Sequence, residues 1–362
     1  MTEERDAHVA LALTPGIGPD RFARLVKAFD SAHGALAAPF ALLGTVAGLS
    51  RAAATAVVSQ SPSAGTVVRK AVEALGGVCL LPGDPQFPKA LESIPQPPLV
   101  LFALGDVGLL ATPAVAIVGS RDHSDYGERT TRLVAGAAAR AGITVVSGMA
   151  RGLDAEAHSA ALDANGGTIG VLGNGLGVVY PAANRRLYQR VQREGLLLTE
   201  YPPGEKPHAG SFPKRNRLIS GLARVTVVVE AAAGSGTLIT VESALDQGRD
   251  VMAVPGPITS PTSTGTNRLI RDGAIPLLVP GDLLELYGRQ ASVQREDARP
   301  RPIPQLSAED ARLVGVLGAA PVQLDVLAET VRQPVAQVLD RLCALELAGV
   351  IEQRPGRLFV RT

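Results

Sequence analysis

A short basic stretch, 211-SFPKRNRLISGLA-223, is the first place where side chains could do chemistry. It places Phe212, Lys214, Arg215 and Arg217 close together, although the whole chain is almost neutral, with 35 Lys and Arg against 34 Asp and Glu. The wider segment 181–224 holds nine Lys or Arg and three acids, which gives it a local charge of +6. Positive charge gathered in one zone of a neutral chain predicts a site for a polyanion. The alternative interpretation of such a cluster is a solvated helix face.

A glycine-rich turn, 234-GSGT-237, joins an apolar run to a helical pattern. Glycine lets backbone N–H groups approach an anion, and a helix N-terminus favours negative charge, so the turn predicts a phosphate cradle. It is not a Walker loop, because no Lys follows Gly236, and no G-x-G-x-x-G follows the first strand. Glu242, one turn into the helix, either caps the helix dipole or faces solvent.

Two more polar segments complete the set: 119-GSRDHSDYG-127, in which Arg121 comes directly after an apolar run, and 147-SGMARGLD-154. None of them suggests catalysis. Asp154 and His158 are spaced for one helix face, which is more often a stabilising contact than a catalytic pair, and no nucleophile lies beside them. His208 is isolated and is interpreted as a surface residue that could contact phosphate. We therefore predict no catalytic residue and no cofactor.

The elements that must position these segments alternate between short apolar runs and helical patterns. The helical patterns include 127–142 and 237–248, and the apolar runs are 115-VAIVG, 144-TVVSG, 168-TIGVLG, 196-LLLTE, 225-VTVVVE, 251-VMAVPG and 276-PLLV. Continuous apolar strands alternating with helices predict a parallel sheet covered on both faces. We expect an α/β, doubly wound Rossmann-like domain over residues 77–288. Ligands of such sheets bind beyond the carboxyl ends of the strands, where the four polar segments are expected to meet.

The flanking segments have different patterns. Residues 1–76 read as a helical domain of the SAM or helix-hairpin-helix type, in which the G-I-G turn at 16–18 is interpreted as a plain helix connection. Residues 289–307 read as a linker. In 308–362, two helical patterns (322–331 and 334–349) precede a hairpin with its turn at Pro355-Gly356, which predicts a winged-helix-like domain. Its six Arg and seven acids suit a protein-interaction or dimer-support module better than a phosphate-binding one.

Composition excludes several classes of protein. An apolar fraction of 46% with 19% charged residues indicates a folded chain. Cys79 and Cys343 lie far apart without ligand spacing, so neither a disulfide framework nor a metal site is predicted. No uninterrupted apolar run approaches the ~20 residues of a membrane span. The N-terminus carries acids rather than an apolar core, so we predict no secretory signal, no membrane association and a cytoplasmic location.

The motifs also resemble those of a known family. The series GSRDHSDYG, SGMARGLDAEAHSAAL, TIGVLGNGLGVVYPAANRRLY, LLLTEYPPG, FPKRNRLISGLA, GSGTLIT and GRDVMAVPG occurs in this order over roughly residues 80–280. It closely resembles the DNA-processing protein A (DprA, also called Smf) family of bacteria. The resemblance implies a non-enzymatic protein that binds single-stranded DNA and loads the RecA recombinase onto it in natural transformation and recombination. It also implies a homodimer formed through the Rossmann-like domain.

The resemblance further implies which residues contact DNA. It assigns a basic pocket to Arg121, Lys214, Arg215, Asn216 and Arg217, with Phe212 beside it. It adds close backbone or hydroxyl contacts from Gly119, Ser120, Gly148, Ser211, Gly234, Ser235, Gly236 and Thr237. Aromatic residues make up only 3% of the chain, so phosphate attraction should dominate over base stacking. Binding should then weaken steeply with salt and carry little sequence specificity.

Two other functions stay open at this point. Phosphoribohydrolases of the LOG family have a related fold and a phosphate loop of the pattern G-T-x-E-E. The corresponding positions here are Ile239 and Thr240, so the carboxylates that would act on a ribosyl bond are missing. A winged-helix transcription regulator, the other alternative, would prefer duplex operators to oligo-dT.

Overall fold

The computed structural model describes residues 2–61, 63–289, 306–318, 320–348, 350–354 and 356–361. These residues form two compact units, Met1–Ser292 and Val293–Thr362. The predicted helical and Rossmann-like domains both fall within the first unit. Most of the predicted linker, residues 290–305, lies outside the described residues.

The centre of the first unit is a mostly parallel sheet. Within the described residues its nine strands run in the order β1-β2-β6-β5-β4-β3-β7-β8-β9. Their bounds are β1 Val78–Leu80, β2 Leu101–Gly105, β3 Ala114–Val118, β4 Thr144–Ser147, β5 Thr168–Val171, β6 Leu196–Thr199, β7 Val225–Val228, β8 Asp250–Ala253 and β9 Ile275–Pro276. The seven predicted apolar runs form β3 to β9, and every neighbouring pair among these strands is parallel. The prediction of a doubly wound α/β sheet is therefore confirmed.

One edge of the sheet departs from the parallel pattern. β2 pairs antiparallel with β6, and β1 pairs antiparallel with β2. Parallel neighbours need a crossover helix, whereas an antiparallel addition needs only a return of the chain. β1 and β2 thus extend the sheet at this edge without a crossover helix between them.

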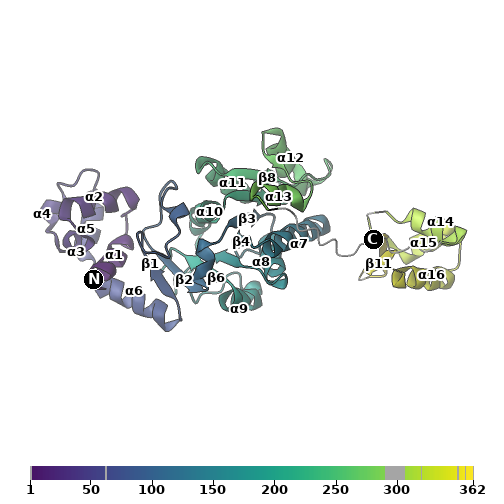
Figure 1. Ribbon diagram of the computed structural model, residues 1–362, viewed down its shortest axis with the longest axis horizontal. Coiled ribbons are helices and arrows are strands. Elements are labelled where there is room, and N and C mark those ends of the chain that lie inside the picture. The colour runs from purple at the N-terminus through teal and green to yellow at the C-terminus, as the bar shows by residue number, and fades with distance from the viewer. Residues whose placement is uncertain are drawn as a thin grey trace. The chain divides into compact units, whose positions relative to one another are not determined.

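Helices cover both faces of the sheet, which explains why the central strands are apolar on both sides. One face packs against α7 Asp125–Arg140, α8 Leu153–Asp163 and α13 Pro280–Leu286, and the other against α10 Ser211–Leu222 and α11 Thr237–Asp246. α12 Thr264–Arg271 packs beside β8, and α9 Arg185–Glu194 lies against β2, β5 and β6. In Figure 1, α10 and α11 lie on the opposite side of the strands from α8 and α9.

The chain's first six helices form their own small core. They are α1 Thr2–Ala12, α2 Pro19–Phe29, α3 Ala32–Ala37, α4 Phe40–Leu43, α5 Arg51–Ser59 and α6 Ser63–Ala74. Polar contacts join them to the sheet region: Arg5 pairs with Asp84 at 2.5 Å, and His8 Nε2 lies 2.8 Å from the carbonyl oxygen of Leu99. In the G-I-G turn, the Gly16 carbonyl accepts a hydrogen bond from Arg21 of α2 at 2.7 Å, so the turn is fastened to its own helix.

The second unit has the order of a winged helix. Its elements are α14 Ala308–Val316, β10 Val322–Gln323, α15 Leu324–Val331, α16 Val335–Leu347, β11 Ile351–Arg354 and β12 Leu358–Arg361. The strands pair antiparallel in the order β10-β12-β11, so the predicted hairpin is present and the first two residues of the predicted helix 322–331 join its sheet instead. Arg341 of α16 pairs with Glu309 and Asp310 of α14, so one of the few cations of this unit is neutralised internally.

Candidate nucleic-acid interface

A groove of about 640 Å³ runs along the carboxyl edge of the sheet. It lies where the loops after β3 and β7 diverge, since β4 lies on one side of β3 and β7 on the other. Such a switch point is where doubly wound sheets bind ligands. The groove gathers ten of the predicted site residues: Gly119, Ser120, Arg121, Phe212, Arg215, Asn216, Gly234, Ser235, Gly236 and Thr237.

The glycine-rich turn presents backbone donors to this groove. Gly234 has a φ of 74°, a left-handed conformation that glycine adopts without strain. The Thr237 hydroxyl donates to the carbonyl of Gly119 at 3.1 Å and so ties the turn to the end of β3. α11 begins after Gly236 without a side-chain cap, and the N–H groups of Gly234 and Gly236 donate to no group among the described residues. This arrangement can bind a phosphate through N–H groups and the helix dipole.

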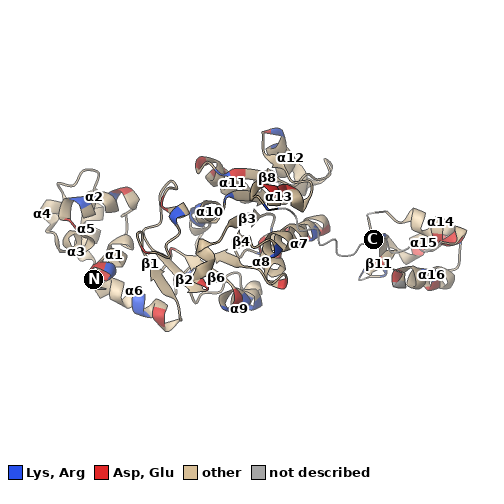
Figure 2. Ribbon diagram, viewed as in Figure 1, with Lys and Arg blue, Asp and Glu red and all other residues tan. Residues whose placement is uncertain are grey.

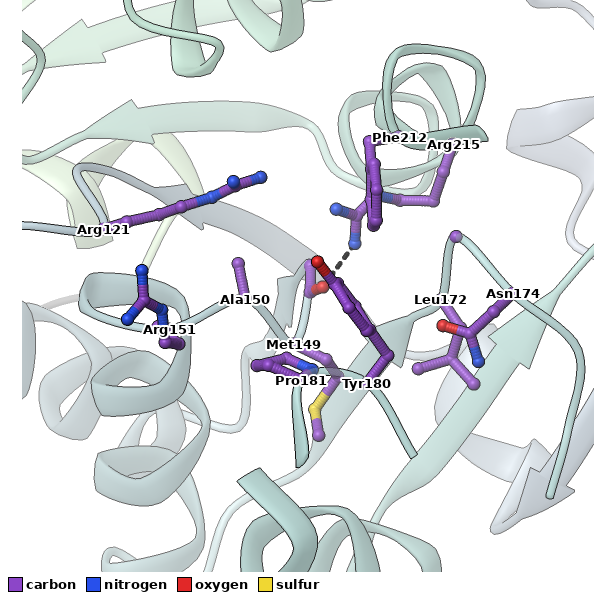
Figure 3. Close-up of a pocket in the computed structure, with 12 residues that line it drawn as sticks. Arg121, Met149, Ala150, Arg151, Leu172, Asn174, Tyr180, Pro181, Phe212 and Arg215 are labelled. Atoms are coloured by element: carbon purple, nitrogen blue, oxygen red, sulfur yellow. Dashed lines mark hydrogen bonds between the residues drawn. The ribbon is translucent and has the colours of Figure 1, made fainter. Parts of the chain in front are cut away.

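A smaller pocket of about 180 Å³ opens beside the groove and shares Arg121, Ala150, Phe212 and Arg215 with it. Its wall is aromatic: the rings of Tyr180 and Phe212 lie 5.5 Å apart with a tilt of 35°. The Arg121 guanidinium carbon lies 6.0 Å from the centre of the Phe212 ring, a cation–π geometry. Figure 3 shows Arg121 and Arg151 on one side of the pocket, and Tyr180 next to Phe212.

Arg215 lies in the lining of both the groove and the pocket, where it was predicted, but its side chain points into the protein. Only 4% of the residue is exposed, and its Nη1 donates to the carbonyls of Gly148 and Val171, which follow or end β4 and β5. Burial lowers its pKa to about 10, which leaves it charged at neutral pH. Arg215 therefore positions two loops of the pocket and adds a fixed positive charge behind them.

Gly148 is required by this arrangement. A Cβ at this position would lie 2.7 Å from both the Arg215 guanidinium carbon and Asp154 Oδ2. Asp154 accepts hydrogen bonds from the N–H groups of Gly148 at 3.1 Å and Ala150 at 3.4 Å. Burial raises the pKa of Asp154, and the nearby charge of Arg215 opposes that shift.

Three predicted site residues line neither the groove nor the pocket. Arg217 is mostly buried and pairs with Glu200 at 2.5 Å. Lys214 is exposed, but its Nζ lies 5.6 Å from the ring of Tyr201. Ser211 is buried, and its hydroxyl donates to the His208 carbonyl at 2.7 Å at the start of α10. Of the predicted basic pocket, Arg121, Arg215 and Asn216 therefore line the groove, whereas Lys214 and Arg217 do not.

Several cations of the wider basic segment also make internal contacts. Arg190 pairs with Asp163 and Glu194, Arg193 lies near Glu194, and Arg224 lies over the ring of Tyr287. Figure 2 shows blue and red interleaved along α9. The exposed cations that line the pocket and have no acidic partner among the described residues are Arg121 and Arg151. The local charge of +6 therefore overstates what the segment offers to a polyanion.

The sequence interpretation missed Tyr180, Asn174 and Arg151. Tyr180 and Asn174 lie in the loop after β5, which ends at the same edge as the four predicted segments. That position was the signal, because the carboxyl ends of parallel strands share one edge. Arg151 lies within the predicted segment 147–154 but was not singled out.

The remaining polar residues of the sequence interpretation lie apart from this chemistry. His158 is buried, its Nδ1 lies 2.7 Å from the Thr168 hydroxyl, and burial lowers its pKa to about 3. His208 is exposed and edge-on to Tyr201, and Glu242 is exposed outside the lining of the groove. No cluster of three or more His, Cys, Asp or Glu that could hold a metal occurs among the described residues. None of the described helices has the length and apolar character to cross a membrane.

The rim loops brace one another. Buried Glu230, after β7, accepts hydrogen bonds from the Ser124 N–H at 3.0 Å, the Ser124 hydroxyl at 2.5 Å and the Thr262 hydroxyl at 3.0 Å. Gly152 has a φ of 77°, and a Cβ there would lie 2.5 Å from the Ser120 carbonyl oxygen. The loops after β3, β4, β7 and β8 are therefore held in fixed relation.

Comparisons with known proteins agree with this geometry. The family DNA recombination-mediator protein A matches residues 78–288, and the DprA winged helix domain matches residues 297–357. Protein Smf of Escherichia coli is 41% identical over 290 residues, which are 76% of each chain.

Two solved structures are also similar. DNA processing protein A of Streptococcus pneumoniae is 32% identical with a TM-score of 0.68, covering 77% of this chain and 97% of that one. DNA processing protein A of Helicobacter pylori, whose structure is described as showing a single-stranded DNA binding mode, is 31% identical with a TM-score of 0.54, covering 58% of this chain and 95% of that one. With the family match over most of the sheet and a relative this similar over three quarters of the chain, this protein belongs to the DprA/Smf family of DNA recombination mediators.

Proposed function

We propose that this protein binds single-stranded DNA at the carboxyl edge of its sheet and loads the RecA recombinase onto it in natural transformation and recombination. The observation that carries the proposal is a convergence of three kinds of group on one cleft. Backbone N–H donors come from the glycine-rich turn, exposed cations from Arg121 and Arg151, and aromatic faces from Tyr180 and Phe212.

These groups suit an unpaired strand better than a duplex. Phosphates can approach the glycine-rich turn and Arg121, and an aromatic ring can stack only on a base whose face is free. In a duplex the base faces are covered by their neighbours. The description of the Helicobacter pylori relative as a single-stranded DNA binder supports the same assignment.

The remaining parts of the proposal follow from the family. Its description as a recombination mediator supports delivery of the strand to RecA, which would place the protein in the cytoplasm. We propose a homodimer through the Rossmann-like domain, supported by the exposed edge strand β9 and the exposed Leu278 and Val279 that follow it. Uncovered edge strands with apolar neighbours tend to pair with another chain.

No enzymatic step is proposed. Ile239 and Thr240 occupy the positions of the two glutamates of LOG-like phosphoribohydrolases. The two acids that line the groove are Asp122 and Asp154, and Asp154 already accepts hydrogen bonds from the N–H groups of Gly148 and Ala150. Release of free base from a nucleoside monophosphate would support that alternative instead.

Fluorescence anisotropy with labelled oligo-dT and a duplex of equal length tests the binding. We expect the single strand to bind more tightly, and equal or tighter binding of the duplex would contradict the proposal. Loading is tested by the rate of RecA filament formation on single strands covered with a single-strand-binding protein. Adding this protein should raise that rate, and an unchanged rate would refute the loading role.

A further inference from the structure

Another cavity of the first unit lies between the N-terminal helices and the sheet region. One of its walls is α2, and the other is the segment 82–99, which connects β1 with β2. Its volume is about 550 Å³, and none of its lining residues lines the groove or the smaller pocket at the carboxyl edge. Cavities of about 300–1,000 Å³ at the boundary between two domains are typical binding sites. We call this cavity the α2 groove.

The walls of the α2 groove are almost entirely apolar. The segment 82–99 contributes Phe87, Leu99 and three prolines. The residues from the helix are Pro19, Phe22, Ala23, Val26 and Lys27. Their spacing places them on one face of α2, so this face of the helix packs only partly against the rest of the protein. Single exposed apolar side chains are normal, whereas a continuous concave apolar surface indicates a site for another molecule.

The two walls are held at a fixed separation. The ring of His8 in α1 lies 4.5 Å from the ring of Phe22, and its Nε2 lies 2.8 Å from the Leu99 carbonyl oxygen. The ion pair of Arg5 with Asp84 joins the same helix to the segment 82–99. The α2 groove is therefore formed before a ligand arrives, and its walls lose little conformational entropy on binding.

Two charges of opposite sign complete the lining. Lys27 and Glu92 are both exposed, and neither forms an ion pair with a residue that the structure describes. A purely apolar ligand would leave both charges without a partner, and an apolar ligand with one acidic head would match only Lys27. The lining therefore favours an occupant that carries an apolar surface together with one acid and one base.

The dimensions of the α2 groove suit a short helix. Pro19 and Lys27 are eight residues apart, which is about 12 Å along the axis of α2. Positions i, i+4 and i+7 of a second helix span about 10.5 Å. The volume of about 550 Å³ is more than three times the roughly 150 Å³ of a cavity that holds benzene, so three apolar side chains fit. Ala23, small and exposed between the two ends, lets a second backbone approach closely.

We propose that the α2 groove binds an amphipathic helix of a partner protein, which inserts three apolar side chains at positions i, i+4 and i+7. An acid of that helix pairs with Lys27 and a base pairs with Glu92. Helices that lay an apolar face into a groove recur in protein recognition. The inference goes beyond the proposed single-strand binding, because it gives the protein a second site for a ligand of a different class. A partner protein and a strand can then be held at the same time.

The test begins with a displayed library of random peptides about twelve residues long, enough for three helical turns. Selection on the full-length protein should enrich peptides with apolar residues at i, i+4 and i+7 and with one acid and one base beside them. Fluorescence anisotropy then measures the affinity of one labelled peptide from this set. Ala23→Gln places a longer side chain in the centre of the α2 groove and should weaken binding at least about tenfold.

Two further variants make the result specific. Ala28→Gln makes the same substitution at an exposed position of α2 outside the lining, and it should bind the peptide as the wild type does. Lys27→Glu should weaken binding about twofold to fivefold, and a peptide whose acid is replaced by lysine should restore it. Ala23→Gln should bind oligo-dT as tightly as the wild type, and a loss of both activities would contradict the separation of the two sites.

The other outcomes overturn the inference. Enrichment of proline-rich peptides would assign the α2 groove to an extended segment instead of a helix. Self-association of the wild type that Ala23→Gln abolishes would assign it to a second copy of this chain. No enrichment at all, or equal binding of the peptide to the wild type and Ala23→Gln, would show that the α2 groove is not a peptide site.

Discussion

Replacing Arg121 by glutamine should weaken single-strand binding and reduce its salt dependence by a calculable amount. Arg121 is exposed, lines both the groove and the pocket, and has no acidic partner among the described residues. Its removal should therefore cost one phosphate contact and little folding stability. A charged hydrogen bond contributes about 1.5–3 kcal/mol, so the loss of affinity at 50 mM salt should be about tenfold or more.

The salt dependence gives a sharper number. Each neutralised phosphate of a single strand contributes about 0.7 to the slope of log affinity against log salt. Arg121 and Arg151 together predict a slope of about −1.4, or about a sevenfold loss between 50 and 200 mM salt. Without Arg121 the slope should be about −0.7. The ratio of wild-type to variant affinity should therefore be about 2.6-fold smaller at 200 mM than at 50 mM salt.

The assay is an anisotropy titration with oligo-dT at several salt concentrations. Arg193→Gln is the matched control, because it removes the same charge from an exposed residue outside both cleft linings. An unchanged slope for Arg121→Gln, or an equal change for the control, would refute the reasoning that local contacts rather than net charge carry the binding.

Two further predictions concern the framework. Gly148→Ala should cost about 1–3 kcal/mol of unfolding free energy, because the new methyl group would press on the Arg215 guanidinium; urea denaturation measures it, and an unchanged midpoint would contradict the packing. The hydrogen-bonded ion pair with Arg69 of α6 lowers the pKa of the Asp6 carboxyl. The ion pair therefore stabilises the fold above the unfolded-state pKa of about 3.9, and this stabilisation is lost as the pH falls below that value. Asp6→Asn should therefore lose less stability than the wild type between pH 5 and 3 in urea titrations, whereas Asp30→Asn, at an exposed acid, should follow the wild type.

The framework of the site could be predicted from sequence because it depends on local patterns. A short, continuous apolar run such as 225–228 is typical of a strand in a sheet that is covered on both faces. The alternation of these runs with helices then predicts that the loops after the strands meet at one edge of the sheet. The glycine-rich turn at 234–237 was predicted by the same logic, since its conformation and its place before a helix are local properties.

Which of the predicted cations are available to a ligand could not be predicted, because this depends on contacts between residues distant in sequence. Glu200 neutralises Arg217 from a different element, and no spacing rule pairs a strand end with a residue in the middle of a later helix. Arg215 did carry a signal: with Leu218 and Ile219 it falls at helical spacing on the buried face of α10. A cation on the apolar face of a helix is a candidate for an internal role. This pattern would have predicted that Arg215 positions loops of the protein rather than contacting the ligand.

The bracing of the rim loops has a consequence for the proposed binding of a single strand. Glu230 and Gly152 fix loops from several strands against one another, so the groups that line the cleft are preorganised before a ligand binds. Most of the conformational entropy lost on binding would then be lost by the nucleic acid, because its sugar-phosphate chain must adapt to a rigid protein surface. A strand whose own bases stack strongly would resist that bending, so runs of adenine should be accepted less readily than runs of thymine even where no side chain distinguishes the two.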